Sequence, residues 1–118
     1  MERRRFKSGE YICHEGDPGQ EAFVVHSGVI DVRRRINGVE KSLARYGEGE
    51  LVGQLALFRK GPRSADMVAA VDTELLVITY ERLEWLIRNR TQLTLEILKS
   101  LSELVVATDS QRTAPAAS

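Results

Sequence analysis

The sequence has few of the side chains on which most enzymes depend. Its 118 residues include one cysteine and two histidines. The single cysteine, Cys13, excludes an internal disulfide and suits a reducing compartment, so we expect a cytoplasmic protein. His14 and His26 are too few for a histidine-rich metal centre, and no Ser-His-Asp or Cys-His arrangement can be assembled from the pattern. We therefore expect a protein that is not an enzyme and carries neither a metal nor a cofactor.

The sequence also lacks an excess of charge of either sign. Lysine plus arginine and aspartate plus glutamate each number 17, so the formal net charge is zero. No overall positive field favours nucleic acid, and we expect no nucleic-acid binding through this chain. The arginine triplets at 3–5 and 33–35 are short runs that we expect to be solvated. No apolar stretch approaches the length of a membrane span, and no secretory signal is visible.

Short strand patterns separated by turn signals fill the first two-thirds of the chain. Phe6 belongs to the first of them, and the others are predicted at 10–13, 21–26, 29–36, 39–46, 51–52, 66–71 and 74–79. Asn37-Gly38 is a strong hairpin signal, because a type I′ turn needs positive φ at both central residues. Closely spaced strands without intervening helices predict an antiparallel roll or barrel. The length predicts a single domain, over 1–110, with a flexible tail over 111–118.

The last third of the chain has a helical period instead. Thr79 is the predicted N-cap of a helix over 80–89. A second helix is expected to begin near Thr91, with an apolar stripe from Leu93 to Val105. Such a stripe buries one face, so we expect it either to cover a ligand site or to form a parallel homodimer.

Residues 53–65 carry the main functional pattern. Gly53 lets the backbone approach a ligand closely, since it has no Cβ. Residues 54–58 can form a little more than one helical turn, and the N–H groups at a helix start attract anions. Gly61-Pro62 turns the chain, and Arg63 then offers a forked guanidinium suited to two phosphate oxygens. The run predicts a site for one compact anion, with phosphate as the leading candidate.

This run resembles the phosphate-binding cassette of cyclic-nucleotide-binding domains. The family pattern is Gly-Glu-Leu/Met-Ala-Leu, a short gap and then Pro-Arg-Ser/Thr/Ala-Ala; this chain has Gly53-Gln54-Leu55-Ala56-Leu57 and Pro62-Arg63-Ser64-Ala65. Further matches in order and spacing are Phe6, Gly9-Glu10-Tyr11-Ile12, Glu15-Gly16-Asp17, Ala22-Phe23-Val24-Val25, Gly28 and Tyr46-Gly47-Glu48-Gly49. The resemblance covers roughly residues 6–108. It implies a mainly β fold: an antiparallel jelly-roll barrel with a short cassette helix and two C-terminal helices.

The resemblance also implies a function. It indicates a regulatory domain that binds cAMP or cGMP and signals through its C-terminal helices to an output domain or partner protein outside this chain. Arg63 would pair with the cyclic phosphate, and Ser64 is compatible with either base. The implied ligand-binding residues are Gly53, Gln54, Leu55, Ala56, Arg63, Ser64 and Ala65.

Gln54 departs from the family pattern, which has a glutamate that accepts a hydrogen bond from the ribose 2′-hydroxyl. The glutamine carbonyl can still accept, but without charge assistance, so we expect binding weaker by about 1 kcal/mol. The alternative is a degenerate domain that acts as a protein-interaction module or binds another small anion. Gln54 favours this alternative, whereas the Pro62-Arg63-Ser64 trio argues against it, because folding alone does not require that trio.

Overall fold

The computed structural model describes residues 2–59, 61–89, 92, 95 and 99. It divides into two compact units, Met1–Arg82 and Leu83–Ser118. The strands of the first unit, within the described residues, are β1 (Arg3–Phe6), β2 (Tyr11–Cys13), β3 (Ala22–Ser27), β4 (Ile30–Ile36), β5 (Val39–Tyr46), β6 (Leu51–Val52), β7 (Asp66–Ala69) and β8 (Thr73–Ile78).

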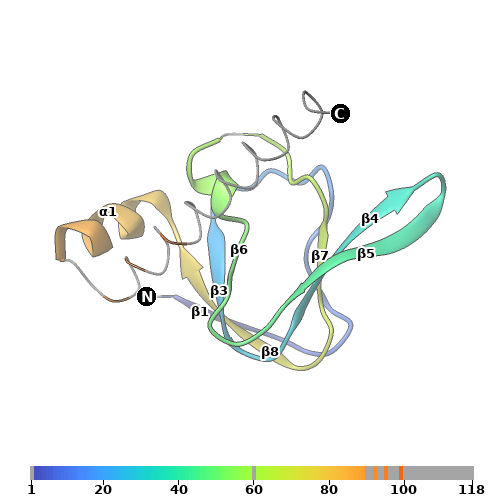
Figure 1. The fold of residues 1–118 in the computed structure, drawn as a ribbon, viewed down its shortest axis with the longest axis horizontal. Helices are drawn as coiled ribbons and strands as arrows, with labels where there is room; N and C mark the ends of the chain where they lie inside the picture. The colour runs from blue at the N-terminus through green and yellow to red at the C-terminus, as the bar shows by residue number, and fades with distance from the viewer. Residues whose placement is uncertain (1, 60, 90–91, 93–94, 96–98, 100–118) are drawn as a thin grey trace, which may run out of the picture. The chain divides into compact units, whose positions relative to one another are not determined.

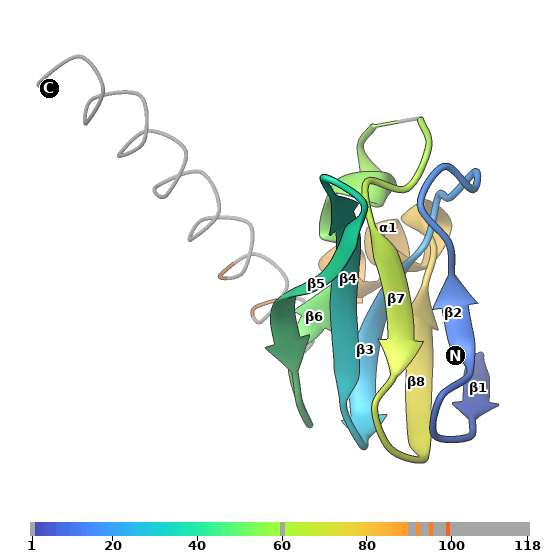
Figure 2. The ribbon, with the colours of Figure 1, turned by 90° about the vertical axis from the view of Figure 1, so that its right-hand side faces the viewer.

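These strands form two antiparallel sheets that face one another (Figure 2). One sheet has the strand order β1-β8-β3-β6 and the other the order β2-β7-β4-β5. Every pairing is antiparallel. The predicted jelly-roll fold is therefore confirmed, although in the described part of the chain the two sheets do not close into one continuous barrel.

The hydrophobic core lies between the two sheets and draws on both. Over residues 73–77 of β8 the buried residues alternate with less buried ones, as expected of a strand with one face on a core. Phe23, Ile30 and Leu75 are among the largest fully buried side chains, and burying each stabilises the fold by roughly 1.5–3 kcal/mol. The core cluster comprises Cys13, Phe23, Val25, Ile30, Val52, Met67, Leu75 and Val77.

The hairpin between β4 and β5 forms where the sequence predicts it. Asn37 and Gly38 have φ values of 52° and 77°, and Ile36 pairs with Val39 across the turn. Positive φ at both central residues is what a type I′ turn requires, so the prediction is confirmed.

Helix α1 (Tyr80–Asn89) has the predicted bounds (Figure 1). The backbone N–H of Arg82 donates to Thr79 Oγ1 at 3.1 Å, which confirms Thr79 as the N-cap. Leu83 and Leu86 are its buried residues.

The predicted second helix, its apolar stripe and the tail lie outside the described residues, apart from isolated positions. Within the described ranges, no helix is long and apolar enough to cross a membrane.

The arginines of the first triplet form ion pairs, and their side chains remain 38–85% exposed, in agreement with the prediction of a solvated run. Alternation along β1 places Arg3 and Arg5 near Glu74 on β8, with N···O distances of 3.8 and 3.5 Å. Arg4 pairs instead with Glu21, at 3.0 Å. One strand thus presents its arginines to different acidic partners.

In the second triplet, Arg33 pairs with a buried carboxylate. Asp31 is 3% exposed and accepts hydrogen bonds from Ser42 Oγ and from Arg33 Nε. Burial alone would raise the pKa of Asp31, but the hydrogen bonds from Ser42 and Arg33, with the arginine charges, outweigh it and hold the pKa below its ordinary value. Arg34 donates from Nε to the Ser64 carbonyl at 2.9 Å, which ties β4 to the segment before β7.

Candidate functional site

The predicted cassette begins where β6 meets a short 3₁₀ helix, η1 (Gln54–Leu57). Gly53 is its N-cap and has the left-handed conformation, with φ 76° and ψ 22°, which glycine adopts without strain. A Cβ at Gly53 would lie 3.1 Å from Arg63 Nη1 and 3.3 Å from Met67 Cε. Glycine therefore serves both the backbone turn and the close approach of Arg63.

Main-chain hydrogen bonds set the position of Arg63. Its N–H donates to the Asp17 carbonyl at 2.7 Å, and its carbonyl accepts from the Gly16 N–H at 2.8 Å. Pro18 and Pro62 form an isolated antiparallel bridge beside them. The loop before β3 and the segment before β7 are thus joined through backbone atoms, independently of the arginine side chain.

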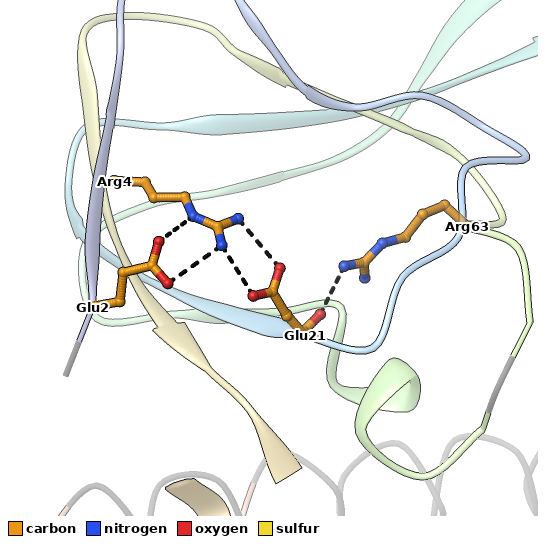
Figure 3. A network of polar contacts seen from close by, with 4 residues as sticks. All are labelled: Glu2, Arg4, Glu21 and Arg63. Atoms are coloured by element: carbon orange, nitrogen blue, oxygen red, sulfur yellow. Dashed lines mark hydrogen bonds and ion pairs between the residues drawn. The ribbon is translucent and has the colours of Figure 1, made fainter. Parts of the chain in front are cut away.

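The Arg63 side chain turns inward, and the residue as a whole is only 8% exposed. Its Nη2 donates to the Glu21 carbonyl at 2.9 Å, and its Cζ lies 5.5 Å from the centroid of the Phe23 ring, a cation–π distance. A Cβ at Gly19 would lie 2.0 Å from Arg63 Nε, so the guanidinium rests directly on that glycine. Figure 3 shows the guanidinium directed at the Glu21 main chain.

Arg63 Nε is buried and has no hydrogen-bond partner. Among the described residues it is the only buried side-chain nitrogen or oxygen without a hydrogen-bond partner. An unsatisfied buried donor is unfavourable by about 1–3 kcal/mol, and by more on a charged group. Native proteins rarely retain such an atom without a reason, and a site for an anionic ligand is one such reason.

A cavity of about 760 Å³ lies beside this arginine, a size typical of small-molecule sites. Arg4, Arg59 and Arg63 contribute positive charge to its lining, and Asp17, Glu21 and Glu81 contribute negative charge. Phe58 and Tyr80 also line it, with their rings edge to face and their centroids 6.3 Å apart. The lining therefore combines charged and aromatic side chains, as an amphipathic ligand would require.

The structure brings together only part of the predicted site. Ala56 and Arg63 line the cavity, and Gly53 lies against Arg63. The other predicted residues do not line it: Gln54 is half-buried at the start of η1, Leu55 and Ser64 are exposed, and Ala65 is buried. Ser64 instead accepts a hydrogen bond from Arg34 through its carbonyl.

The residues that hold the Arg63 side chain were missed by the sequence reasoning. Gly19, Glu21 and Phe23 contact it from the loop before β3 and from β3 itself. Gly19 stands in a turn-rich run, Glu15-Gly16-Asp17-Pro18-Gly19, which explains its presence without a ligand. No local signal marks Glu21, whose contact with Arg63 spans 42 residues.

Comparison with known proteins identifies the family of this chain. The family model described as the cyclic nucleotide-binding domain matches residues 3–90. The chain belongs to the cyclic nucleotide-binding domain family. Cyclic AMP receptor protein of Thermus thermophilus is 42% identical over 89 residues, which are 75% of this chain and 41% of that protein. A cAMP-dependent protein kinase regulatory subunit of Mycosarcoma maydis is 33% identical over 74 residues, 63% of this chain and 14% of that protein.

Solved structures of the family have the same fold. The catabolite activator protein of Thermus thermophilus superposes with a TM-score of 0.80 at 34% identity, covering 98% of this chain and 55% of that one. The N-terminal domain of a transcriptional regulator from Streptomyces coelicolor gives 0.75 at 29% identity, covering 94% and 78%. The chain spans less than half the length of the two curated relatives named above.

Proposed function

We propose that this chain is a regulatory domain that binds a cyclic nucleotide, cAMP or cGMP, and that Arg63 pairs with the cyclic phosphate. The observation that carries the proposal is the buried Arg63 guanidinium on the cavity wall, whose Nε has no partner. A phosphate in the cavity would offer this guanidinium charge-assisted hydrogen bonds. Similarity to a cyclic AMP receptor protein makes cAMP the first nucleotide to test.

The rest of the predicted cassette has subordinate roles in this proposal. Gly53 and the start of η1 approach the phosphate, and Gln54 accepts from the ribose 2′-hydroxyl through its side-chain carbonyl. Leu55, Ala56 and Ala65 supply packing, and Ser64 contributes its hydroxyl to the phosphate or the base. The role of the domain is to bind and not to catalyse, and its place is the cytoplasm.

Binding is also proposed to act on the C-terminal helices and, through them, on an output domain or partner outside this chain. A ligand shifts such an equilibrium only as far as it prefers one state over the other. Trp85 in α1 is the single tryptophan of the sequence and is about half exposed. A change of its fluorescence on nucleotide addition is the expected sign of this relay, and an unchanged spectrum at saturation would contradict it.

The binding proposal is tested by calorimetric titration of nucleotide-stripped protein with cAMP and with cGMP. Arg63→Ala should weaken binding about ten- to a hundredfold, because a hydrogen bond to a charged group contributes about 1.5–3 kcal/mol. Arg59→Ala is the matched control: Arg59 is exposed and lines the same cavity, so it removes the same charge without removing the buried anchor. We expect it to change the Kd less than about threefold.

Two outcomes would contradict the proposal. Folded, stripped protein that binds neither nucleotide would exclude cyclic-nucleotide sensing and would direct attention to other small anions or to protein partners. Equal losses in Arg63→Ala and Arg59→Ala would show that the cavity attracts anions by overall charge and that Arg63 is not a specific anchor.

A further inference from the structure

Glu21 contacts two arginines through different atoms (Figure 3). Its carboxylate oxygens accept hydrogen bonds from Arg4 Nη1 at 3.2 Å and from Arg4 Nη2 at 3.0 Å. Its main-chain carbonyl accepts from Arg63 Nη2 at 2.9 Å. The carboxylate therefore belongs to the very residue whose backbone touches the proposed phosphate anchor, yet it is directed to Arg4.

A carboxylate in this place is a potential competitor for the phosphate. Carboxylates and phosphates bind the same forked guanidinium. The Glu21 side chain is 29% exposed and the Arg63 residue 8% exposed, so an ion pair between them would be screened less than a surface pair. Arg63 Nε would be a free donor for it. Something must hold the Glu21 carboxylate away if an anionic ligand is to use Arg63.

Arg4 is well placed for this task. It meets the Glu21 carboxylate fork to fork, a geometry that gives direction as well as strength. On its other side Arg4 is fixed by Glu2, with Nε to Oε2 at 2.6 Å and Nη2 to Oε1 at 3.4 Å. Its neighbours Arg3 and Arg5 contact Glu74 instead.

We propose that Arg4 is a positioning residue that keeps the Glu21 carboxylate off Arg63 and so leaves the guanidinium available to the phosphate. This inference rests on the proposed function, because it names an internal competitor for the same site. Without Arg4, Glu21 turns to Arg63 and occupies the anchor. Apparent affinity then falls in proportion to the fraction of molecules in which Arg63 is still free.

The test is a double-mutant cycle on nucleotide affinity, with cAMP and cGMP titrated into each stripped protein. If the internal pair forms in about nine-tenths of the Arg4→Gln molecules, then the Kd rises about tenfold. Glu21→Gln alone should stay within about twofold of wild type, since its main-chain carbonyl still holds Arg63. The double variant Arg4→Gln, Glu21→Gln should recover to within about threefold, because the competitor is gone.

Arg5→Gln is the matched control for loss of one β1 arginine. The Arg5 side chain is 85% exposed and pairs with Glu74, so its Kd should equal that of wild type. Thermal unfolding of all variants shows whether they are folded. Should Arg4→Gln fail to fold, Arg4→Lys replaces it; lysine lacks the fork, so its smaller Kd rise should again disappear when Glu21→Gln is added.

The results separate this inference from the function on which it rests. Arg4→Gln with wild-type Kd, or a double variant as weak as Arg4→Gln, would overturn the positioning role while leaving wild-type binding and its loss in Arg63→Ala intact. A purely structural role for Arg4 predicts the second result, because removing Glu21 cannot repair a loosened strand. Wild-type protein that binds neither nucleotide would overturn the proposed function and this inference with it.

Discussion

Replacing Gly19 by alanine should displace the Arg63 side chain and leave the backbone unchanged. The added Cβ would lie 2.0, 2.4 and 2.8 Å from Nε, Cζ and Cδ of Arg63, and carbon atoms do not approach nonbonded atoms this closely. Gly19 is not among the glycines with positive φ, so alanine fits its backbone without strain. The substitution is therefore a steric test of where Arg63 lies.

The expected loss follows from the contacts that Arg63 gives up. Its hydrogen bond to the Glu21 carbonyl, with a charged donor, contributes about 1.5–3 kcal/mol. The Phe23 contact contributes about 0.5–1 kcal/mol. Rehydration of the displaced guanidinium offsets part of both, so the free energy of unfolding should fall by about 1–2 kcal/mol. The Tm should fall by roughly 5–10 °C for a domain of this size.

Thermal unfolding and nucleotide titration measure the two consequences. We expect the Kd of Gly19→Ala to rise about tenfold, because the proposed phosphate anchor has moved. Gly47→Ala is the matched control: Gly47 also lacks a positive φ, and its added Cβ would meet its nearest neighbour, Glu50 Oε1, at 3.9 Å. A Gly19→Ala protein that matches Gly47→Ala in both Tm and Kd would refute the placement of Arg63 on this glycine.

Two further predictions concern the fold around the site. Asp31→Asn should lower the free energy of unfolding by about 2 kcal/mol at pH 7, since charged hydrogen bonds are lost. The folded pKa of Asp31 lies below its unfolded value of about 3.9. The contribution of Asp31 to stability is therefore complete above that value and is lost as the pH falls through the folded pKa. Urea unfolding in which wild type and Asp31→Asn differ in stability by the same amount at pH 7 and at pH 2 would contradict this prediction. Thr79→Ala should destabilise the fold by about 1 kcal/mol through loss of the cap on Arg82. Thr79→Ser should retain stability in the same urea assay, and equal losses in the two variants would exclude the cap.

Local features of the fold were predictable from the sequence because each rests on a few adjacent residues. The Asn37-Gly38 turn follows from the need for positive φ. The start of α1 at Thr79 follows from capping chemistry. Strand positions follow from alternation, with errors of one or two residues at the ends, where hydrogen bonding to a neighbour decides the boundary.

The environment of Arg63 was not predictable from local patterns. Alternation assigns a residue to a face of its strand, but it does not say which distant residue meets it there. Arg4 and Glu21 are 17 residues apart, and Gly19 contacts an arginine more than 40 residues away. For the same reason, the sequence did not show which acidic residues pair with the arginine triplets. Only the pairing of β1 with β8 shows which arginines face Glu74.

Backbone atoms of Arg63 hold the loop in place, whereas its side chain determines what the cavity can bind. Any residue except proline carries both groups, so the hydrogen bonds to Asp17 and Gly16 place no demand on the side chain. Position 63 can therefore be exchanged while the loop keeps its path. A neutral or acidic residue there would change the charge on the cavity wall, which makes this position a natural starting point for redesigning the site.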